Sequence, residues 1–260
     1  MSVCTALLIL LLASVIVMTL TWALQRRHGN AGYVDVVWAA LMGASAIWLS
    51  AVGQGAALPR LLAALLGGIW GFRLSLHLLG RVLGEAEDGR YRYLREYWQG
   101  DQRKLFGFYM FQAISVPLFA LPFLAVAANP QPAFSVWTLA GVLVWLGGLV
   151  GESIADAQLS RFRKQPGNRG RTCRSGLWRY SRHPNYFFEW LHWFGYALLA
   201  IGSPWWWLGL SGPLLMGASL RWLSGIPYTE AQALRSRGED YRAYQRETSM
   251  FFPWPPRSPH

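Results

Sequence analysis

Residues 3–24 read VCTALLILLLASVIVMTLTWAL and contain no charged side chain. A helix of these 22 residues would be about 33 Å long, enough to cross roughly 30 Å of bilayer hydrocarbon. A secretory signal peptide would have a basic leader, a shorter apolar stretch and a small-residue cleavage site, none of which is clear here. The stretch therefore predicts an uncleaved transmembrane helix.

Six further apolar stretches follow along the chain. They cover residues 33–52, 61–79, 105–128, 134–151, 186–202 and 205–220. Only 14% of the 260 residues are charged, against about a quarter in soluble domains, which argues against a soluble protein. The pattern predicts an all-α integral membrane protein with about seven transmembrane helices in a single membrane-embedded domain, 1–260. The last two helices are short and would form a tight hairpin.

The lysines and arginines are distributed very unevenly between alternate loops. Of 24 such residues, 22 follow the first, third, fifth and seventh stretches, Arg60 lies in the opposite loops and Arg73 lies within a span. By the positive-inside rule this predicts an N-terminus outside and a cytoplasmic C-terminus. The net charge of +11 is explained by basic loops that orient the protein in the membrane and contact anionic lipid headgroups. We therefore expect no nucleic-acid partner.

The segments outside the spans contain no independent domain or metal motif. Pro-Gly-Asn and Gly predict a loop over residues 161–174, and alternating charges predict an amphipathic cytoplasmic helix over 228–246. Cys4 and Cys173 lie on opposite sides of the predicted membrane and cannot pair within one chain. No CxxC or HExxH motif is present, so no metal site is predicted.

Several ionisable side chains lie within or beside the predicted spans, where each is costly unless it faces the bundle interior. They are Asp35, Arg73, His77, Glu152, Asp156, Glu189 and His192. Any single one could instead be a structural pair between helices. The whole set, together with eight lysines and arginines between residues 161 and 182, predicts a polar cavity open to the cytoplasm that suits phosphate groups.

One segment carries a family resemblance. GLWRYSRHPNYFFEWLHWFGY, residues 176–196, resembles the C-terminal motif of the membrane steroid 5α-reductase superfamily, closest to its bacterial DUF1295 branch. GESIADAQLSRFRK, YVDVVW, FRLSLHLLGR and the segment over 227–254 are similar to other parts of that branch, so the resemblance covers residues 33–253. Phe188 departs from the pattern, which has glycine there.

The resemblance implies a seven-helix reductase whose cofactor, NADPH, binds on residues 129–260 of the chain. Arginines would hold its pyrophosphate and 2′-phosphate, and polar side chains its ribose and nicotinamide amide. The implied cofactor positions are Asp156, Arg163, Arg171, Tyr180, Arg182, His183, Asn185, Tyr186, Glu189, Glu230 and Tyr241.

The implied reaction is reduction of a carbon–carbon double bond conjugated to a ketone, with hydride supplied by the cofactor. The substrate would be a lipophilic 3-oxo-Δ4 steroid or a related terpenoid enone that enters from the bilayer among the helices of residues 1–128. We expect a monomer in a bacterial inner membrane, with the cofactor site facing the cytoplasm.

Candidates for the catalytic acid lie in the first half of the chain. The main candidate is Asp35, because burial can keep a carboxyl group protonated. The competing interpretation is that Asp35 pairs with Arg73 or caps its helix. The third span lacks the tyrosine of animal relatives and has Trp70 near that place. The other candidate side chains are Tyr33, Arg73, His77 and Tyr91.

Two other functions remain open. An S-adenosylmethionine-dependent membrane methyltransferase of the isoprenylcysteine or phospholipid type shares the Arg-His-Pro motif, although Asn185 and Glu189 beside Tyr186 favour the reductase. A non-enzymatic lipid transporter would often show internal repeats and broken helices, and the sequence has no visible internal symmetry.

Overall fold

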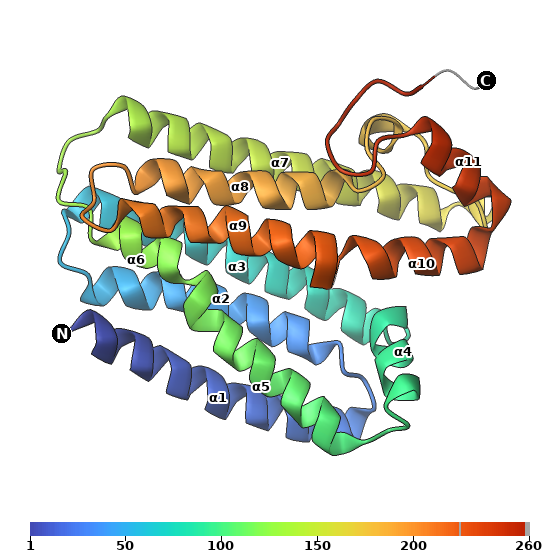
Figure 1. Cartoon of the computed structure of the whole chain (residues 1–260), viewed down its shortest axis with the longest axis horizontal. Coiled ribbons are helices and arrows are strands. Elements are labelled where there is room, and N and C mark those ends of the chain that lie inside the picture. Colours follow the sequence, from blue (N-terminus) through green and yellow to red (C-terminus); the bar gives the residue numbers. More distant parts are fainter. Residues whose placement is uncertain (224, 258–260) are drawn as a thin grey trace. The chain divides into compact units, whose positions relative to one another are not determined.

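This computed structural model describes residues 1–223 and 225–257, and every element of regular secondary structure in them is a helix (Figure 1). Two compact units are present. Unit 1 comprises Met1–Thr138 and Tyr196–Gly212, and unit 2 comprises Leu139–Gly195 and the chain from Pro213 onward. The all-α prediction is confirmed.

Within the described residues, five helical segments are long and apolar enough to cross a membrane. They are α1 (Val3–His28), α2 (Tyr33–Val52), α3 (Ala57–Gly84), the continuous pair α5 (Gln102–Phe119) and α6 (Leu121–Ala127), and α7 (Val136–Lys164). These correspond to the first five predicted spans. Two shorter helices correspond to the sixth and seventh predicted spans. Helix α8 (Pro184–Leu199) has 16 residues and α9 (Ser211–Ala218) has 8 residues. Seven spans and the orientation of the termini stay predictions.

The remaining elements are short. They are α4 (Gly89–Tyr97), η1 (Pro166–Asn168), η2 (Gly176–Arg179), η3 (Trp206–Leu210), the π-helical turn η4 (Ser219–Leu223), α10 (Ile226–Arg237) and α11 (Glu239–Glu247). Two boundaries differ from expectation. Helix α7 continues to Lys164, into the predicted loop. The predicted helix over 228–246 is broken at Gly238, whose φ of 52° favours glycine, and the acidic Glu239 then begins a new helix.

Helix α1 turns its most apolar face outward. Its buried residues recur every three or four positions: Ala6, Leu10, Ser14, Met18, Thr21 and Gln25. Its exposed face carries Leu8, Leu12, Ile16 and Leu20. The hydroxyls of Ser14 and Thr21 each donate to the carbonyl four residues earlier, at 2.8 Å, so the packed face tolerates polar groups. This pattern suits a helix surrounded by lipid.

Glycines bring the backbones of α2 and α3 close together within unit 1. A Cβ atom on Gly71 would lie 2.5 Å from the amide nitrogen of Gly43 and 2.8 Å from the carbonyl oxygen of Ala39. No side chain fits at such distances, so the contact depends on glycine. The Ser75 hydroxyl donates to the carbonyl of Val36 at 2.9 Å in the same interface. The first turn of α2 is thereby fixed against α3.

This close contact predicts that Gly71→Ala lowers stability by about 1–3 kcal/mol, because the added methyl group must push two backbones apart. The apparent melting temperature of the purified chain in detergent, followed by tryptophan fluorescence, measures the effect. Gly80→Ala is the matched control on the same helix, since a Cβ there meets nothing within 4 Å. Equal melting temperatures for the two variants would contradict the account of the interface.

Candidate functional site

The predicted site residues fall into two groups, one in each unit. Unit 1 holds the proposed catalytic side chains, which are Tyr33, Asp35, Arg73 and His77. Unit 2 holds every predicted cofactor position, namely Asp156, Arg163, Arg171, Tyr180, Arg182, His183, Asn185, Tyr186, Glu189, Glu230 and Tyr241.

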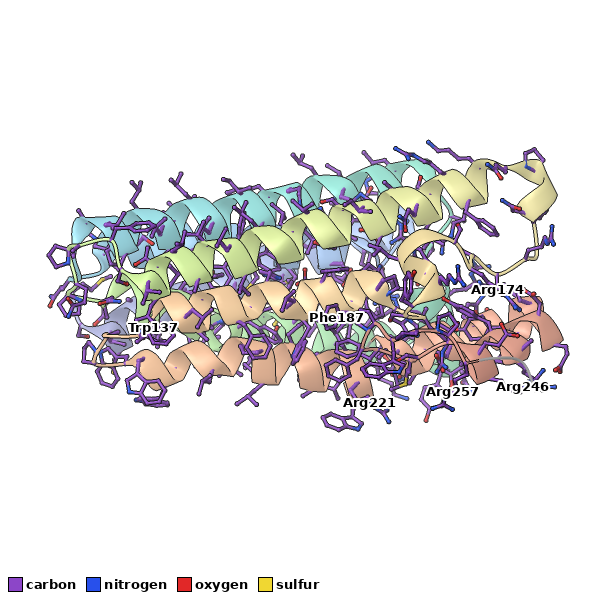
Figure 2. The ribbon with its side chains drawn as sticks, turned by 90° about the horizontal axis from the view of Figure 1, so that it is seen from above. Trp137, Arg174, Phe187, Arg221, Arg246 and Arg257 are labelled. Atoms are coloured by element: carbon purple, nitrogen blue, oxygen red, sulfur yellow. The ribbon has the colours of Figure 1, made fainter. Side chains whose placement is uncertain are left out.

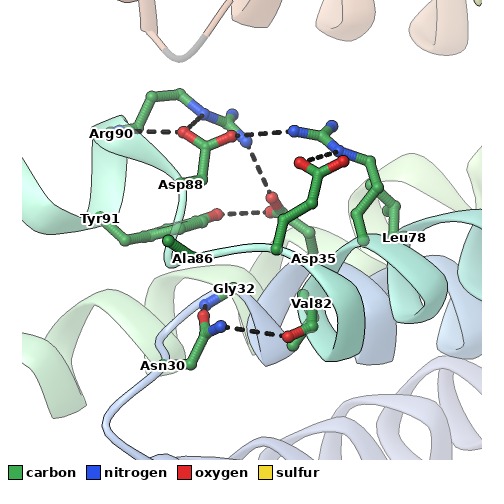
Figure 3. A pocket seen from close by; sticks show the side chains of 11 residues that line it. Asn30, Gly32, Asp35, Leu78, Val82, Ala86, Asp88, Arg90 and Tyr91 are labelled. Carbon is green, nitrogen blue, oxygen red and sulfur yellow. Dashed lines mark hydrogen bonds and ion pairs between the residues drawn. The ribbon is translucent and has the colours of Figure 1, made fainter. Parts of the chain in front are cut away.

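Asp35 lies in the first turn of α2, and two side chains of α4 hold its carboxylate (Figure 3). The Tyr91 hydroxyl donates to Oδ1 at 2.6 Å, and Arg90 Nη2 donates to Oδ2 at 3.0 Å. Arg90 also donates through Nε to Asp88 Oδ1 at 3.2 Å, and Arg81 contacts the other oxygen of Asp88 at 3.5 Å. Arg90 therefore bridges two carboxylates and holds Asp35 beside Tyr91.

An open pocket surrounds this network in unit 1. Its walls come from the α1–α2 loop, the last turns of α3 and the start of α4 (Figure 3). The lining residues are Asn30, Gly32, Asp35, Leu78, Arg81, Val82, Glu85, Ala86, Asp88, Arg90 and Tyr91. The enclosed space is about 30 Å³, roughly the volume of one water molecule, so it accommodates a small polar group such as a single carbonyl oxygen.

Tyr91 places a buried phenol in the wall of this pocket. Burial, together with the negative charge of Asp35, raises the pKa of Tyr91 well above its ordinary value. For Asp88, burial raises the pKa, but the charge and hydrogen bonds of Arg90 lower it further, so the net pKa lies below the ordinary value. At neutral pH the pocket thus combines a protonated Tyr91 phenol with an ionised Asp88 carboxylate.

The other predicted catalytic residues are not among the described residues that line this pocket. The Tyr33 ring contacts His28 with centroids 6.0 Å apart. Arg73 and His77 lie one turn apart on α3, and His77 is exposed. Sequence reasoning named Tyr91 only as another donor and missed Arg90. A sequence signal for their position is Asp88, a residue type that often caps helices. It indicates that Arg90 and Tyr91 lie in the first turn of a new helix.

Glu230 of α10 is the centre of the group in unit 2. Its Oε1 accepts from Arg182 Nε at 2.7 Å, lies 3.2 Å from His183 Nε2 and lies 3.4 Å from the Tyr241 hydroxyl. Its Oε2 accepts from Gln245 Nε2 at 2.9 Å. A carboxylate with four such neighbours has its hydrogen-bonding capacity largely filled.

The ionisation of these groups follows from their burial and contacts. Burial raises the pKa of Glu230, but hydrogen bonds from His183 and Arg182 outweigh it and lower that pKa to about 2. Burial lowers the pKa of His183 below its ordinary value, although Glu230 opposes the shift. At neutral pH we therefore interpret the cluster as an Arg182–Glu230 ion pair beside a neutral imidazole that donates through Nε2.

Arg182 also fixes the end of α11. Its Nη1 donates to the carbonyls of Gln245 at 3.0 Å and Thr248 at 2.9 Å. Its backbone amide donates to the Ser249 carbonyl at 2.8 Å. The guanidinium is therefore occupied by one carboxylate and two carbonyls, and its role in this conformation is to join three chain segments.

Further main-chain contacts hold the C-terminal tail, residues 248–257, beside the YSRHP stretch of the motif. The Ser181 hydroxyl donates to the Phe251 carbonyl at 2.8 Å, and the Trp254 amide donates to the Tyr180 carbonyl at 2.9 Å. The Tyr244 hydroxyl donates to the Ser181 carbonyl at 3.1 Å. The tail is thus docked along the motif by its backbone.

The start of α8 connects to α7 and α10 through the motif side chains. The rings of His183 and Tyr186 stack with centroids 5.4 Å apart and planes 6° apart. The Tyr186 hydroxyl lies 3.1 Å from Thr229 Oγ1, and Asn185 Nδ2 donates to Asp156 Oδ1 at 3.1 Å. The structure therefore brings together the motif residues and the acidic residue of α7 that the resemblance associated with them.

Glu189 and Phe188 lie deeper along α8. Glu189 is buried, and Trp193 Nε1 donates to its Oε1 at 3.3 Å. Phe188 lies against Gly151 of α7, where an added Cβ would come within 2.3 Å of its ring. A glycine on α7 thus makes room for the large Phe188 side chain on α8.

A set of cations in unit 2 is exposed. These are Arg161, Lys164, Arg169, Arg171 and Arg179, whose side chains form no hydrogen bond or ion pair with any residue that the structure describes. Arg163 and Tyr180 are exposed as well. By contrast, Arg174 pairs with Glu247 at 3.1 Å and Asp240 at 3.0 Å. Several predicted phosphate ligands are therefore available to an anion.

The cluster predicts a loss of stability in acid. The stability contributed by Glu230 is complete above its ordinary pKa of 4.5 and is lost as pH falls toward about 2. His183 adds a loss that begins as pH falls below 6.5. We expect Glu230→Gln to lower stability at pH 7 by about 3 kcal/mol and to flatten the pH dependence below 4.5.

The melting temperature of the full chain in detergent, measured across this pH range, tests the prediction. Glu239→Gln is the matched control, because Glu239 forms exposed pairs with Arg242 and Arg246 on α11. Identical curves for Glu230→Gln and the unmodified protein would show that the cluster does not stabilise unit 2.

Comparison with known proteins gives the family but no described activity. The chain matches the family described as "Protein of unknown function (DUF1295)" over residues 21–248, which include Asp35 and Glu230. It is 28% identical over 278 residues to "Uncharacterized protein C594.04c" of Schizosaccharomyces pombe, covering 94% of this chain and 78% of that protein. It is 38% identical over 93 residues to "Uncharacterized protein C9.08c" of the same yeast, covering 29% and 33%. No solved structure matches.

The family match extends across both units and confirms the resemblance carried by the RHPNY segment. Assignment to the bacterial branch stays a prediction. The chain belongs to the DUF1295 family, which is part of the steroid 5α-reductase-like superfamily.

Proposed function

We propose that this protein is an NADPH-dependent membrane reductase of a carbon–carbon double bond conjugated to a ketone. The substrate class is a lipophilic enone, a 3-oxo-Δ4 steroid or a related terpenoid. One observation carries the proposal. Arg182 and His183 contact Glu230, and Asn185 donates to Asp156, in a unit that also carries exposed cations without a partner among the described residues.

The residues of unit 2 fit the chemistry of this dinucleotide. Its pyrophosphate and 2′-phosphate call for charge-assisted donors, and Arg163, Arg171 and Arg179 are exposed guanidinium groups near the motif in sequence. Asp156, Asn185 and the other polar positions offer carboxylate and amide groups to ribose and nicotinamide. When bound, NADPH would supply the hydride. Arg182 and Glu230 act by holding the motif in shape.

In unit 1 we assign the proton to Tyr91. Its phenol stays protonated at neutral pH and lines the pocket, where the ketone end of the substrate would lie. Asp35 accepts its hydrogen bond and is held in turn by Arg90, so the carboxylate orients the phenol. On substrate binding the hydroxyl would turn toward the carbonyl oxygen and stabilise the developing enolate.

The membrane arrangement belongs to the same proposal. We infer that α8 is the short sixth crossing and that residues 206–223, in which α9 lies between η3 and η4, are the seventh, with the N-terminus outside and the cofactor side in the cytoplasm. The support is the split of lysine and arginine between alternate loops, 22 against 1. A monomer in a bacterial inner membrane is the form we propose for the active protein.

Tyr91→Phe tests the proton assignment. We expect turnover of an enone such as progesterone, followed as NADPH oxidation, to fall by about 10²–10⁴-fold, because general acid catalysis contributes that much. The dissociation constant for NADPH would stay unchanged. Tyr93→Phe is the control, since Tyr93 is an exposed residue of α4 that stacks on Tyr97. Full activity in Tyr91→Phe would exclude the phenol as the donor.

Arg171→Gln tests the cofactor site. Loss of one charge-assisted contact, worth about 1.5–3 kcal/mol, predicts roughly tenfold to hundredfold weaker NADPH binding in a tryptophan fluorescence titration. Arg163→Gln is a second variant, and Arg242→Gln on α11 is the exposed control. An equal loss of NADPH affinity in all three variants would mean that the overall positive charge of the protein determines binding, and not contacts of Arg171 or Arg163 with the cofactor. Unchanged binding in both Arg171→Gln and Arg163→Gln would remove these two arginines from the site.

A further inference from the structure

The docked C-terminal tail exposes two large aromatic side chains. Phe252 is 58% exposed and Trp254 is 68% exposed. The tail is nevertheless held by its backbone, with the Trp254 amide bonded to the Tyr180 carbonyl at 2.9 Å. An aromatic side chain buries about 150–250 Å² when it is covered, so leaving both in water forgoes a large apolar burial. The exposure therefore points to a missing apolar surrounding.

The tail aromatics belong to a cluster that reaches α9. The Phe252 ring lies 6.0 Å from Phe187 and 5.7 Å from Trp190, measured between centroids. Trp190 Nε1 donates to the Pro213 carbonyl at 3.0 Å, and a Cβ on Gly217 would lie 3.0 Å from that nitrogen. Within unit 2 the tail therefore borders the same aromatic cluster as α9.

A second exposed apolar pair follows α9 directly. Trp222 is 69% exposed and Leu223 is 59% exposed, in the π-helical turn that ends the described part of this helix. Each pair has an arginine beside it, Arg221 in the turn and Arg257 in the tail. Figure 2 shows these two arginines on the same side of unit 2. Neither the turn 219–223 nor the tail 248–257 contains an acidic residue.

We propose that Phe252, Trp254, Trp222 and Leu223, here called the interfacial patch, insert into the headgroup region of the bilayer. Tryptophan next to arginine is the composition of a membrane–water interface, where the indole lies at headgroup level and the guanidinium meets anionic phosphate. The absence of acids in both segments and the net charge of +11 complement an anionic lipid surface. The patch lies outside the five helical segments long enough to span.

Lipid anchoring has a consequence for the motif. The tail backbone bonds to Tyr180, Ser181 and Arg182, so an interface that holds Phe252 and Trp254 also holds this segment. The patch thereby links the position of the bilayer surface to the part of unit 2 that carries the Arg182–Glu230 pair.

The test places a fluorophore on the patch in the full-length protein. Phe252→Cys and Trp254→Cys are made separately with Cys4→Ser and Cys173→Ser, labelled with the fluorophore NBD and reconstituted in nanodiscs of phosphatidylcholine and phosphatidylglycerol. Ser236→Cys, an exposed position on α10, is the control. We expect lipid with brominated acyl chains to quench the two patch labels at least twofold more than the control label. Aqueous iodide should show the opposite order.

Two results would overturn the proposal. Patch labels that iodide quenches as strongly as the control would place the patch in water. Patch labels protected from both quenchers would place it under protein, such as a second copy of the chain. The readout needs neither cofactor nor turnover, so its failure and the failure of the proposed reductase activity are separate outcomes. Using two label positions guards against one variant that does not fold.

Discussion

Unit 2 depends on the ion pair between Arg182 and Glu230. Its 2.7 Å contact joins the start of α8 to α10, and the same guanidinium holds two carbonyls at the end of α11. The two side chains are largely buried, so removing one partner leaves a charge with little solvent to compensate it, which costs more free energy than the intact pair contributes. Three segments that are distant in sequence are therefore committed to one arrangement, and the motif around His183 takes its shape from it.

The sequence predicts the positions of the helices better than it predicts the side-chain contacts between them. An uncharged run identifies α1 and its neighbours because span length is a property of the local chain. The partner of Asp35 is a different matter. Sequence reasoning named Arg73, while the structure shows Arg90 and Tyr91, more than fifty residues away, in contact with its carboxylate. Such contacts depend on how α2, α3 and α4 pack against one another, and the hydrophobic periodicity of the sequence does not predict this packing. The break at Gly238 was missed for a related reason, since a glycine inside a helical pattern does not reveal its φ angle.

Phe188, where the resemblance implies glycine, is accommodated by a glycine on the facing helix. Glycines on α7 lie opposite the bulky face of α8, with Gly151 under Phe188 and Gly148 against His192. Small residues on one helix thus accept large ones on the other, and α8 stays close to α7. Asn185 can then reach Asp156 at 3.1 Å despite the larger neighbour. The sequence around position 188 does not reveal this space, because it is provided 37 residues earlier, at Gly151.

The reductase account is tested most directly by the small molecule that the protein binds. The full chain, purified in mild detergent, would be analysed by mass spectrometry for retained ligand and titrated with NADPH, NADH and S-adenosylmethionine by tryptophan fluorescence. The account predicts retained NADP(H), or NADPH binding that is clearly tighter than NADH binding. Binding of S-adenosylmethionine alone would contradict it and indicate a methyltransferase. Binding of none of the three by folded protein would contradict it as well and favour a lipid transporter.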